Sequence, residues 1–506
     1  MQDRPTTLKR YQTYIDGKWT DAASGKVFET SDPYTGEPWA LVPECDARDA
    51  ELACNAAARA FESGPWPAMT ATARGRLLRK MGDLIAKHAK HLAEIEVRDN
   101  GKLISEMYAQ TQYLPEWYYY YGGLADKITG QTIPVDKPDH FCYTLKEPVG
   151  PCVFITPWNS PLMLVGWKLA PALAAGCTVV IKPSEFTSAS LLEFMKLVVE
   201  EAGVPPGVIN VVTGFGAVVG EPLVTHPKIA KVAFTGGTAT GARVNELAAR
   251  TFKKVSLELG GKSPNIMFDD CILDEAVNGA ISGIFAATGQ TCIAGSRLLV
   301  QETIHDKFVE KLVEVAASAK LGNPQLFETQ VGPVTTPPQY QKILGYIDIA
   351  KGEGAKCVLG GGPATAAEGG GKYFVKPTIF TGVNNKMRIA QEEVFGPVLS
   401  VIKFKDEAEA IQIANDIAYG LGSGVWTQSV RRATMMAQKI KAGTVWVNTY
   451  RAVSFTMPFG GYKASGLGRE NGAEAIEGYL QTKSVWINNA VGGGGNPFVM
   501  KTASNS

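Results

Sequence analysis

Between Cys142 and Glu258 the chain alternates short apolar strands with helices, and this alternation limits the fold more than any other feature. The expected strands are GPCVFIT, CTVVIK, VINVVTG, KVAFTG and KVSLEL, with helical patterns such as SASLLEFMKLVVEEAG between them. Strand–helix alternation is typical of a parallel sheet covered by helices. We therefore predict an α/β fold.

The flanking regions extend this pattern. Residues 46–100 are expected to be helical because apolar residues recur at helical spacing, and Asn100-Gly101 is a suitable C-terminal stop. The Gly-rich, polar tail of residues 491–506 is expected to form a flexible end or an ordered arm. A second α/β half is expected from Gly260 to about Gly461, with the strands VLGGG, TIFTGV, VLSVIKF and GTVWVN.

Length and charge exclude several classes of protein. The 506 residues are enough for two to four domains, at roughly 100–200 residues per domain. Basic and acidic side chains nearly balance, at 50 and 49, so no nucleic-acid surface is expected. The most apolar stretch, residues 149–183, is interrupted by Lys168 and several prolines, so no membrane span is expected either.

The cysteines bear on metal binding and compartment. All eight are scattered, with no CxxC pair and no histidine cluster at metal-ligand spacing, so we expect neither a metal site nor a disulfide framework. Reduced thiols fit a cytoplasmic protein. The first ten residues, MQDRPTTLKR, also lack the apolar run of a signal peptide.

One cysteine, Cys292, lies among small residues in GQTCIAGSR. Free cysteine is most often buried packing, so a reactive role needs further support. A thiolate also needs a cationic, dipolar or basic neighbour. None of the five histidines lies in a suggestive motif, which disfavours a Cys–His hydrolase.

Two other motifs contain groups that could assist such a cysteine. In SLELGGKSP, Glu258 lies in an apolar strand, where burial raises the pKa of a carboxyl toward general-base range; a structural salt bridge is the alternative. In TPWNSP, the amide of Asn159 could donate to an oxyanion, although a turn-forming asparagine is the simpler interpretation. Together with Cys292, these residues suggest acyl chemistry through a thioester.

Two further motifs are compatible with a dinucleotide. In KVAFTGGTATG, a strand runs into Gly236-Gly237 before a helix, so backbone N–H groups could meet a phosphate; a plain tight turn fits equally well, because the GxGxxG spacing is absent. In VVIKPSE, Lys182 ends an apolar strand and Glu185 could accept hydrogen bonds from a ribose, unless the two form a surface ion pair.

These motifs, in this order, resemble the NAD(P)-dependent, non-acylating branch of the aldehyde dehydrogenase superfamily. The resemblance runs from YIDGKW to GLGRENG and includes GQTC, EEVFGPV and PFGGYKASGLGRE. It implies a Rossmann-like coenzyme domain, an α/β catalytic domain and a small β oligomerisation arm. The implied boundaries are 1–126 with 149–260 for the coenzyme domain, 261–470 for the catalytic domain, and 127–148 with 478–490 for the arm.

The resemblance implies three catalytic residues. Cys292 matches the nucleophile that attacks the aldehyde carbon, and Asn159 with the Cys292 backbone N–H matches the oxyanion hole. The hemithioacetal then passes hydride to the nicotinamide and becomes a thioester. Glu258 matches the general base that activates water to hydrolyse it.

The resemblance also implies NAD as the cofactor. Many family members have Gly-Ser at the pyrophosphate turn, so a side-chain contact is absent at Gly237, and backbone N–H groups or Thr238 are expected to replace it. Glu185 should repel the 2′-phosphate of NADP, which favours NAD. The implied cofactor-binding residues are Lys182, Glu185, Gly236, Gly237, Glu393 and Phe395.

Family position also implies a substrate tunnel. The run WYYYYGG is expected to be mostly core and interface packing, with one or two rings facing the tunnel. Glu116 is the only acidic candidate nearby, which disfavours a cationic aminoaldehyde and favours an apolar or aromatic aldehyde. The expected lining residues are Tyr113, Trp117, Ser160, Leu164, Trp167, Thr291, Ile293, Val453 and Phe459.

Two alternative functions remain, and a second copy of the chain is an expected partner. A CoA-acylating enzyme would not need a water-activating base, so Glu258 argues against it. A catalytically idle structural or binding protein is disfavoured because Cys292, Glu258, Asn159 and Lys182 are all present. Family members are usually dimers or tetramers, so a homo-oligomer is expected, with an arm strand completing a neighbour's sheet.

Overall fold

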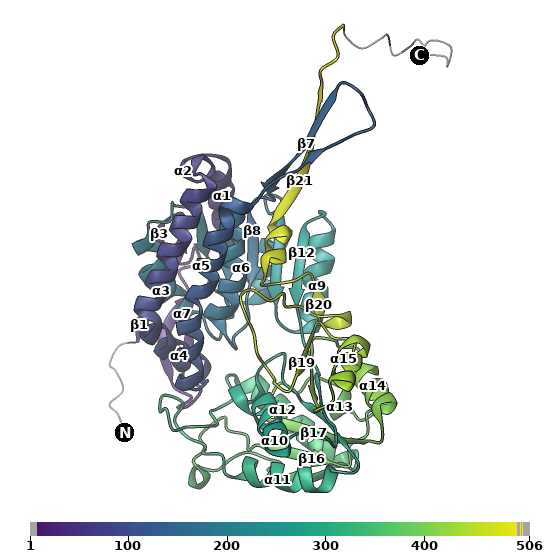
Figure 1. The fold of residues 1–506 in the computed structure, drawn as a ribbon. Helices are drawn as coiled ribbons and strands as arrows, with labels where there is room; N and C mark the ends of the chain where they lie inside the picture. Colours follow the sequence, from purple (N-terminus) through teal and green to yellow (C-terminus); the bar gives the residue numbers. More distant parts are fainter. Residues whose placement is uncertain (1–7, 493–495, 497, 499–506) are drawn as a thin grey trace.

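The computed structural model describes residues 8–492, 496 and 498, and it is built on two large sheets with helices around them (Figure 1). One sheet is formed by the N-terminal half of the chain, drawn in purple to teal, except for one edge strand from near the C-terminus. The other sheet belongs to the C-terminal half, drawn in green. The predicted α/β fold is confirmed.

The first sheet has eight strands, and the five between Cys142 and Glu258 that the sequence predicted form its parallel centre. They are short and buried, as expected for strands covered on both faces. The order is β20 (Gly466–Leu467), β12 (Lys254–Glu258), β11 (Lys231–Thr235), β8 (Cys152–Ile155), β9 (Val179–Lys182), β10 (Ile209–Val211), β2 (Thr13–Ile15) and β3 (Lys18–Thr20).

The second sheet has seven strands, which are parallel except for β15 at one edge. The predicted strand VLGGG is displaced, because Gly360 and Gly361 have positive φ and β15 ends before them. The order is β15 (Lys356–Leu359), β16 (Thr378–Thr381), β17 (Val398–Phe404), β14 (Arg297–Gln301), β13 (Pro264–Met267), β18 (Gly422–Trp426) and β19 (Thr444–Val447).

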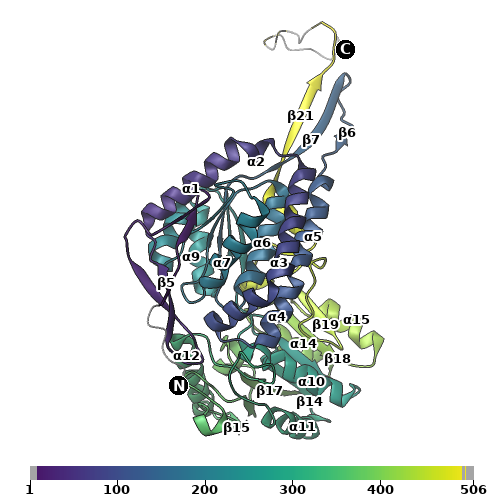
Figure 2. The ribbon, with the colours of Figure 1, turned by 90° about the vertical axis from the view of Figure 1, so that its left-hand side faces the viewer.

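Helices cover both sheets, and in the N-terminal half the long helix α3 packs against α4 and α5 (Figure 2). The helices of this half are α1 (Ala47–Glu62), α2 (Pro65–Ala68), α3 (Ala71–Asn100), α4 (Ile104–Tyr113), α5 (Pro115–Leu124), α6 (Pro161–Ala175), α7 (Ala189–Phe194), α8 (Glu221–Thr225) and α9 (Thr238–Ala249). Those of the C-terminal half are α10 (Leu273–Ile284), α11 (His305–Ala317), α12 (Pro337–Gly352), α13 (Arg388–Gln391), α14 (Glu407–Asn415) and α15 (Val430–Lys439).

The helical region predicted at residues 46–100 is interrupted twice. Gly64 has a φ of 88° and precedes Pro65, which begins the short helix α2. Thr70 then caps α3 by accepting a hydrogen bond from the Ala73 N–H. The predicted end is correct: Gly101, with a φ of 71°, terminates α3.

A three-stranded antiparallel sheet projects from one end of the molecule (Figures 1 and 2). It joins β6 (Thr132–Ile133), β7 (His140–Pro148) and β21 (Leu480–Asn488), with β7 and β21 paired along nine residues. Trp486 and Phe141 remain exposed on these strands. The tail predicted at 491–506 lies almost wholly outside the described residues.

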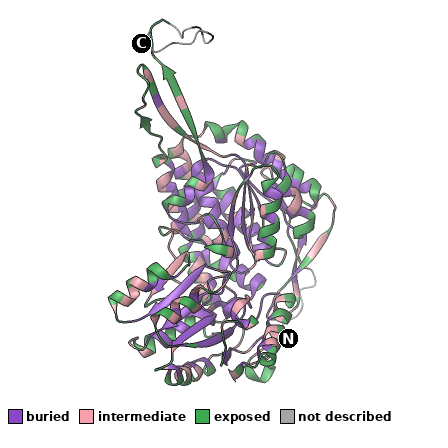
Figure 3. Cartoon of the chain, turned by 90° about the vertical axis from the view of Figure 1, so that its right-hand side faces the viewer, coloured by how far each residue is buried: buried purple, intermediate pink, exposed green. Residues whose placement is uncertain are grey.

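Burial follows the two-sheet plan, with buried strands at the centre and exposed residues on the outer helix faces (Figure 3). A small sheet of β1 (Lys9–Arg10), β5 (Pro38–Pro43) and β4 (Val27–Ser31) completes the fold. Among the described residues, none of the helices combines the length and apolar character needed to cross a membrane.

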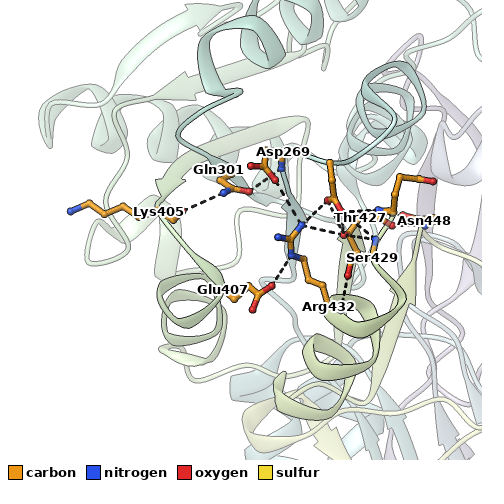
Figure 4. A network of polar contacts seen from close by, with 10 residues as sticks. Asp269, Gln301, Lys405, Glu407, Thr427, Ser429, Arg432 and Asn448 are labelled. Carbon is orange, nitrogen blue, oxygen red and sulfur yellow. Dashed lines mark hydrogen bonds and ion pairs between the residues drawn. The ribbon is translucent and has the colours of Figure 1, made fainter.

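A polar network around Arg432 ties α15 to the rest of the C-terminal half (Figure 4). Its guanidinium bonds to Asp270 and Glu407, both at 2.8 Å, and lies over the Phe268 ring. Asp270 also accepts hydrogen bonds from the Thr427 hydroxyl. These residues line neither of the cavities described below, so we assign the network to the fold.

Candidate active site

The site forms where adjacent parallel strands of the first sheet end at the same edge, which is where α/β sheets bind ligands. The strand β8 leads into the loop of Asn159, β11 into Gly236-Gly237, and β12 ends at Glu258. Because β11 pairs with both β8 and β12, these three segments are neighbours. The loop of Cys292 reaches them from the C-terminal half.

The backbone before Cys292 has an unusual conformation. Ala287, Thr288 and Gly289 all have positive φ, between 53° and 68°. Such φ values are rare for residues with a side chain and are often found at functional sites. At Gly289 a Cβ would clash with the Gly396 carbonyl, so this close approach requires glycine.

The Cys292 thiol is enclosed by protein. Its pKa is raised to about 12, chiefly by burial and to a smaller extent by the nearby Glu393 and Glu258 carboxylates. Hydrogen bonds from the Cys292 and Ile293 backbone N–H groups act in the opposite direction. The resting side chain is therefore a thiol. A bound cation or a base that takes its proton is needed before it attacks.

Asn159 faces the same loop. Its side-chain N–H donates to the backbone carbonyl of Gln290 at 3.0 Å. This bond holds the Asn159 side-chain amide against the loop, two residues before Cys292 in the sequence. An amide nitrogen has two hydrogens, so one remains for an oxygen bound above Cys292. Both the turn and the oxyanion roles considered for this asparagine are therefore compatible with its contacts.

Glu258 is 4% exposed, and among the described residues neither of its carboxylate oxygens has a hydrogen-bond partner. Burial raises its pKa well above the usual range, and the neighbouring Glu470 raises it further; Lys168 and Arg469 act in the opposite direction. The predicted salt-bridge alternative fails, because no ion pair involves Glu258 in the described chain. A buried carboxyl with a raised pKa is suited to accept a proton near neutral pH.

A buried ion pair lies beside Glu258, and the sequence analysis did not identify it. Lys168 bonds to Glu470 at 2.5 Å and to the Thr235 hydroxyl at 2.6 Å, and Thr235 pairs with Glu258 across β11 and β12. The available signal was Lys168 itself, a lysine inside an otherwise apolar helix. A buried lysine needs a buried partner.

One cavity, of about 330 Å³, extends from Cys292 between the helices. All nine residues expected in the substrate tunnel line this cavity, and Trp117 stacks on Trp167 with ring centroids 6.0 Å apart. Tyr118 and Tyr121 are buried core residues, as expected for most of the aromatic run. The lining residues that sequence reasoning missed are Ala109, Gln110, Met163, Thr235 and Arg451.

A second cavity, of about 200 Å³, reaches Cys292 from the other side. It is lined by four of the six residues that the resemblance assigns to the cofactor: Gly236, Gly237, Glu393 and Phe395. The Glu393 carboxylate accepts a hydrogen bond from the Gly261 N–H at 2.8 Å. The further lining residues, which sequence reasoning missed, include Pro157, Trp158, Leu259, Gly260, Gln339 and Lys342.

Lys182 and Glu185 lie at the same sheet edge but outside this lining. Lys182 ends β9 and is 2% exposed, so it is not a surface lysine. Its ammonium donates to the Pro183 carbonyl at 2.9 Å and lies 3.7 Å from Glu185, whose side chain is partly exposed. The strand order β11-β8-β9 places this pair two strands from Gly236.

The second cavity fits a dinucleotide phosphate by its backbone. Helix α9 begins at Thr238 after Gly237, and within the described part of the chain no side chain caps its first N–H groups. A Cβ at Gly237 would meet nothing within 4 Å, so the approach to these donors is open. The Thr238 hydroxyl is buried next to Gly260, and Thr238 is not among the described residues that line the cavity, so the available donors on this side are backbone N–H groups.

Comparison with known proteins gives the family. The model of the aldehyde dehydrogenase family matches residues 19–485. The chain belongs to the aldehyde dehydrogenase family. The predicted family, the enzyme class that it implies and the fold are confirmed. No group of three or more His, Cys, Asp or Glu side chains arranged to hold a metal ion occurs in the part of this aldehyde dehydrogenase that is described.

Curated relatives and solved structures cover nearly the whole aldehyde dehydrogenase chain. It is 48% identical to (Z)-2-((N-methylformamido)methylene)-5-hydroxybutyrolactone dehydrogenase of Acinetobacter baylyi, over 98% of this chain and all of the relative. An NAD+ complex of an aldehyde dehydrogenase from Bacillus cereus matches with a TM-score of 0.92 and 46% identity, covering 95% of this chain and 97% of that chain. Betaine aldehyde dehydrogenase from Staphylococcus aureus with NAD+ matches at 0.93 and 42%, with 95% of both chains covered.

Proposed function

We propose that this protein oxidises an aldehyde to the carboxylic acid with reduction of NAD, through a covalent intermediate on Cys292. The observation that carries the proposal is the meeting of two cavities at a shared wall. That wall contains Cys292, Glu258, Asn159, Leu164 and Thr235. An aldehyde in one cavity and a cofactor in the other would both reach the thiol.

The first half of the reaction uses Cys292 and Asn159. The Cys292 sulfur, after losing its proton, attacks the aldehyde carbon and forms a hemithioacetal. The oxygen that gains negative charge accepts hydrogen bonds from the Asn159 side-chain N–H and the Cys292 backbone N–H. Bound NAD would supply the oxidation by serving as hydride acceptor, and Cys292 would then hold the acyl group as a thioester.

The second half uses Glu258. Its buried carboxylate takes a proton from water, and the resulting nucleophile attacks the thioester and releases the carboxylic acid and the thiol. Lys168 and Glu470 lie beside Glu258 and set the charge around it. A thioester handed to CoA would not need this base, so hydrolysis is favoured over acyl transfer.

NAD agrees with the two solved neighbours reported above, both of which are complexes with it. In this chain the helix α9 N-terminus would hold the pyrophosphate, Glu393 the nicotinamide ribose, and Lys182 with Glu185 the adenine ribose. The Phe395 ring meets Trp158 edge to face at 5.3 Å and would wall the nicotinamide side. The partly exposed Glu185 carboxylate would repel a 2′-phosphate, so NAD should give a higher kcat/KM than NADP.

The tunnel favours an aldehyde with an apolar or aromatic body, because Trp117, Trp167 and Phe459 form its walls. Glu258 is the only carboxylate in that lining, and Glu116 does not contribute to it. A cationic substrate, as the name of the betaine aldehyde dehydrogenase neighbour indicates for that enzyme, would find no partner of opposite charge along the walls.

The projecting sheet of β6, β7 and β21 is the proposed oligomerisation arm. Its exposed Phe141, Leu145 and Trp486 would be covered by a second copy of the chain. We also propose the domain division that the two sheets suggest, with 1–126 and 149–260 binding the coenzyme and 261–470 carrying Cys292. The strand β20 then returns from the catalytic segment to pair with β12.

The test is NADH formation with a panel of short aliphatic, long aliphatic, aromatic and trimethylammonium aldehydes, with NAD and NADP compared. The lactol named for the Acinetobacter relative, a 5-hydroxybutyrolactone, belongs in the panel. Turnover of the apolar aldehydes with NAD supports the proposal. Acyl-CoA formation on adding CoA, or no turnover of any member, contradicts it.

A further inference from the structure

The aldehyde tunnel contains a positive charge that the proposed reaction does not use. Arg451 lines the cavity together with Trp117, Trp167 and Phe459. Its guanidinium donates to the Ser282 carbonyl at 3.2 Å, and no carboxylate lies within ion-pair distance of it in the part of the chain that is described. A guanidinium has five N–H donors, so most of them remain available to a ligand.

The backbone conformation of Arg451 is a second observation that points to a binding role. Its φ is 65°, in the left-handed region that a long side chain rarely adopts. Such conformations persist only where the surroundings enforce them, and they concentrate at binding sites. The neighbouring Asn448 has the same backbone conformation, with a φ of 51°, so the loop is turned at two points.

The charges around the tunnel leave Arg451 uncompensated. Lys102 is fully buried and donates to the Ser160 hydroxyl at 3.1 Å. The adjacent Glu106 balances Lys102 electrostatically, and one of its oxygens is held by the Ala287 N–H. Of the described residues that line the cavity, Arg451 is the one cation, and Glu258, in the wall shared with the second cavity, is the one carboxylate.

Unpartnered polar atoms lie on the same walls. The Gln110 side-chain oxygen and the Thr291 hydroxyl are buried and line the cavity, and neither has a hydrogen-bond partner among the described residues. Leaving such groups unpaired costs free energy, so a bound molecule with polar atoms is favoured over a plain hydrocarbon. The tunnel thus combines an aromatic middle with a polar, cationic portion.

We infer that the preferred substrate is an aldehyde that carries a carboxylate at the far end of an apolar chain, an ω-oxo acid, and that Arg451 binds this carboxylate. The inference rests on the proposed oxidation at Cys292 and specifies its substrate class. The aldehyde end lies at Cys292, the chain passes between the aromatic walls, and the guanidinium forms a charge-assisted contact with the carboxylate. The same charge disfavours trimethylammonium aldehydes.

The experiment compares substrates of equal length and opposite charge. We would measure kcat/KM for ω-oxo acids of four to eight carbons, for the neutral aldehydes of the same lengths, and for trimethylammonium aldehydes. The wild-type protein should prefer the oxo acid over the neutral aldehyde by about 10- to 100-fold at its best length, which is typical of a charged hydrogen bond. The difference should lie mainly in KM and shrink as salt rises.

Three substitutions at one position make the test specific. Asparagine tolerates a positive φ, so Arg451→Asn removes the charge with little added backbone strain. This variant should lose the oxo-acid preference, because kcat/KM should fall much more for the oxo acid than for the neutral aldehyde, which does not use the charge. Arg451→Lys should recover part of the preference, and Arg451→Asp should favour the trimethylammonium aldehyde.

The control is Arg431→Asn, which changes an exposed arginine of α15 outside the cavity and should alter no preference. Equal losses with neutral and anionic substrates in Arg451→Asn would show that Arg451 only braces the Ser282 carbonyl, and would overturn the inference. An absent oxo-acid preference in the wild type would also overturn it, while turnover of the neutral aldehydes would leave the proposed oxidation intact. No turnover of any substrate would refute the oxidation itself.

Discussion

The two cavities that meet at Cys292 differ in how they are built. The aldehyde tunnel is walled by large side chains, among them Trp117, Trp167 and Phe459. The cofactor cavity is walled largely by backbone and small residues, including Gly236, Gly237 and Gly260, with Glu393 as its carboxylate. A wall made of side chains can be changed by substitution while the fold is kept. A wall made of backbone can be changed only by altering the fold.

This contrast indicates where substrate choice and chemistry reside. The residues common to both cavities, Cys292, Glu258 and Asn159 among them, are those proposed for the reaction. On the proposed function, the residues found only in the tunnel would select the aldehyde, and those found only in the other cavity would set the affinity for NAD. Substitutions in the shared wall, beside it and in the cofactor cavity would separate these roles.

The largest effect is expected at Cys292. Because the proposed reaction forms its covalent bond at Cys292, Cys292→Ala should lower aldehyde oxidation by about 10⁴-fold or more, as loss of a nucleophile typically does. NAD binding, measured by calorimetry, should remain within about threefold, since the cavity walls are kept. Substantial residual turnover would remove Cys292 from the mechanism.

Glu258→Gln should have the next largest effect. The amide cannot take a proton from water, so steady-state turnover should fall by about 10²- to 10⁴-fold, the usual contribution of a general base. Formation of the thioester should survive, because the change leaves Cys292 and Asn159 in place. Normal steady-state turnover in this variant would show that another group activates the water.

The buried pair beside Glu258 should control the pH dependence. Activity needs Glu258 deprotonated, so kcat should fall as pH falls through its raised pKa. Glu470→Gln removes a carboxylate that raises this pKa and should move the acid limb of the kcat profile to lower pH by about one unit. Lys168→Met removes a cation and should move the limb to higher pH.

Stability provides the control for these two variants. Each single change leaves a buried charge unpaired and should lower the free energy of unfolding by about 3–5 kcal/mol. The double variant Lys168→Met/Glu470→Gln removes both charges and should recover part of that loss. An acid limb that stays in place in both single variants would separate the pair from Glu258.

The smallest effect is expected at Gly237, in the cofactor cavity. A Cβ there would meet nothing within 4 Å, so Gly237→Ser should fold normally and add a hydroxyl near the pyrophosphate. The KM for NAD should fall by about two- to fivefold, the net gain of one hydrogen bond from the hydroxyl to a phosphate oxygen, with kcat for the aldehyde little changed. A raised KM would mean that the side chain obstructs the dinucleotide.

Much of the fold was predictable because strand and helix signals alternate clearly in the sequence. The strands β13, β14 and β18 were not named in advance. Strand β18 contains Gly422 and Gly424, and β13 begins with a proline and is only four residues long, so local preference for strand is weak in both. Their pairing in the second sheet decides their structure.

The residues of the candidate site likewise divide into those that the sequence predicted and those that it did not. Residues in compact motifs, such as Cys292 in GQTC and Glu258 in LELGG, were found from the sequence, and the structure brings them to one wall. The sequence did not predict the positions of Lys168, Glu470 and Arg451, because the contacts of each are with residues remote in sequence. A lysine in an apolar helix signals a buried partner, but it does not say which carboxylate that partner is.

The most direct test of the account is a single-turnover experiment with Glu258→Gln, NAD and an aldehyde that the wild-type protein oxidises. NADH release would be followed by absorbance, and the peptide containing Cys292 would be analysed by mass spectrometry after quenching. The account predicts about one NADH per active site, followed by a stall, with the acyl group attached to Cys292. A burst without that adduct, or an adduct on another residue, would contradict it.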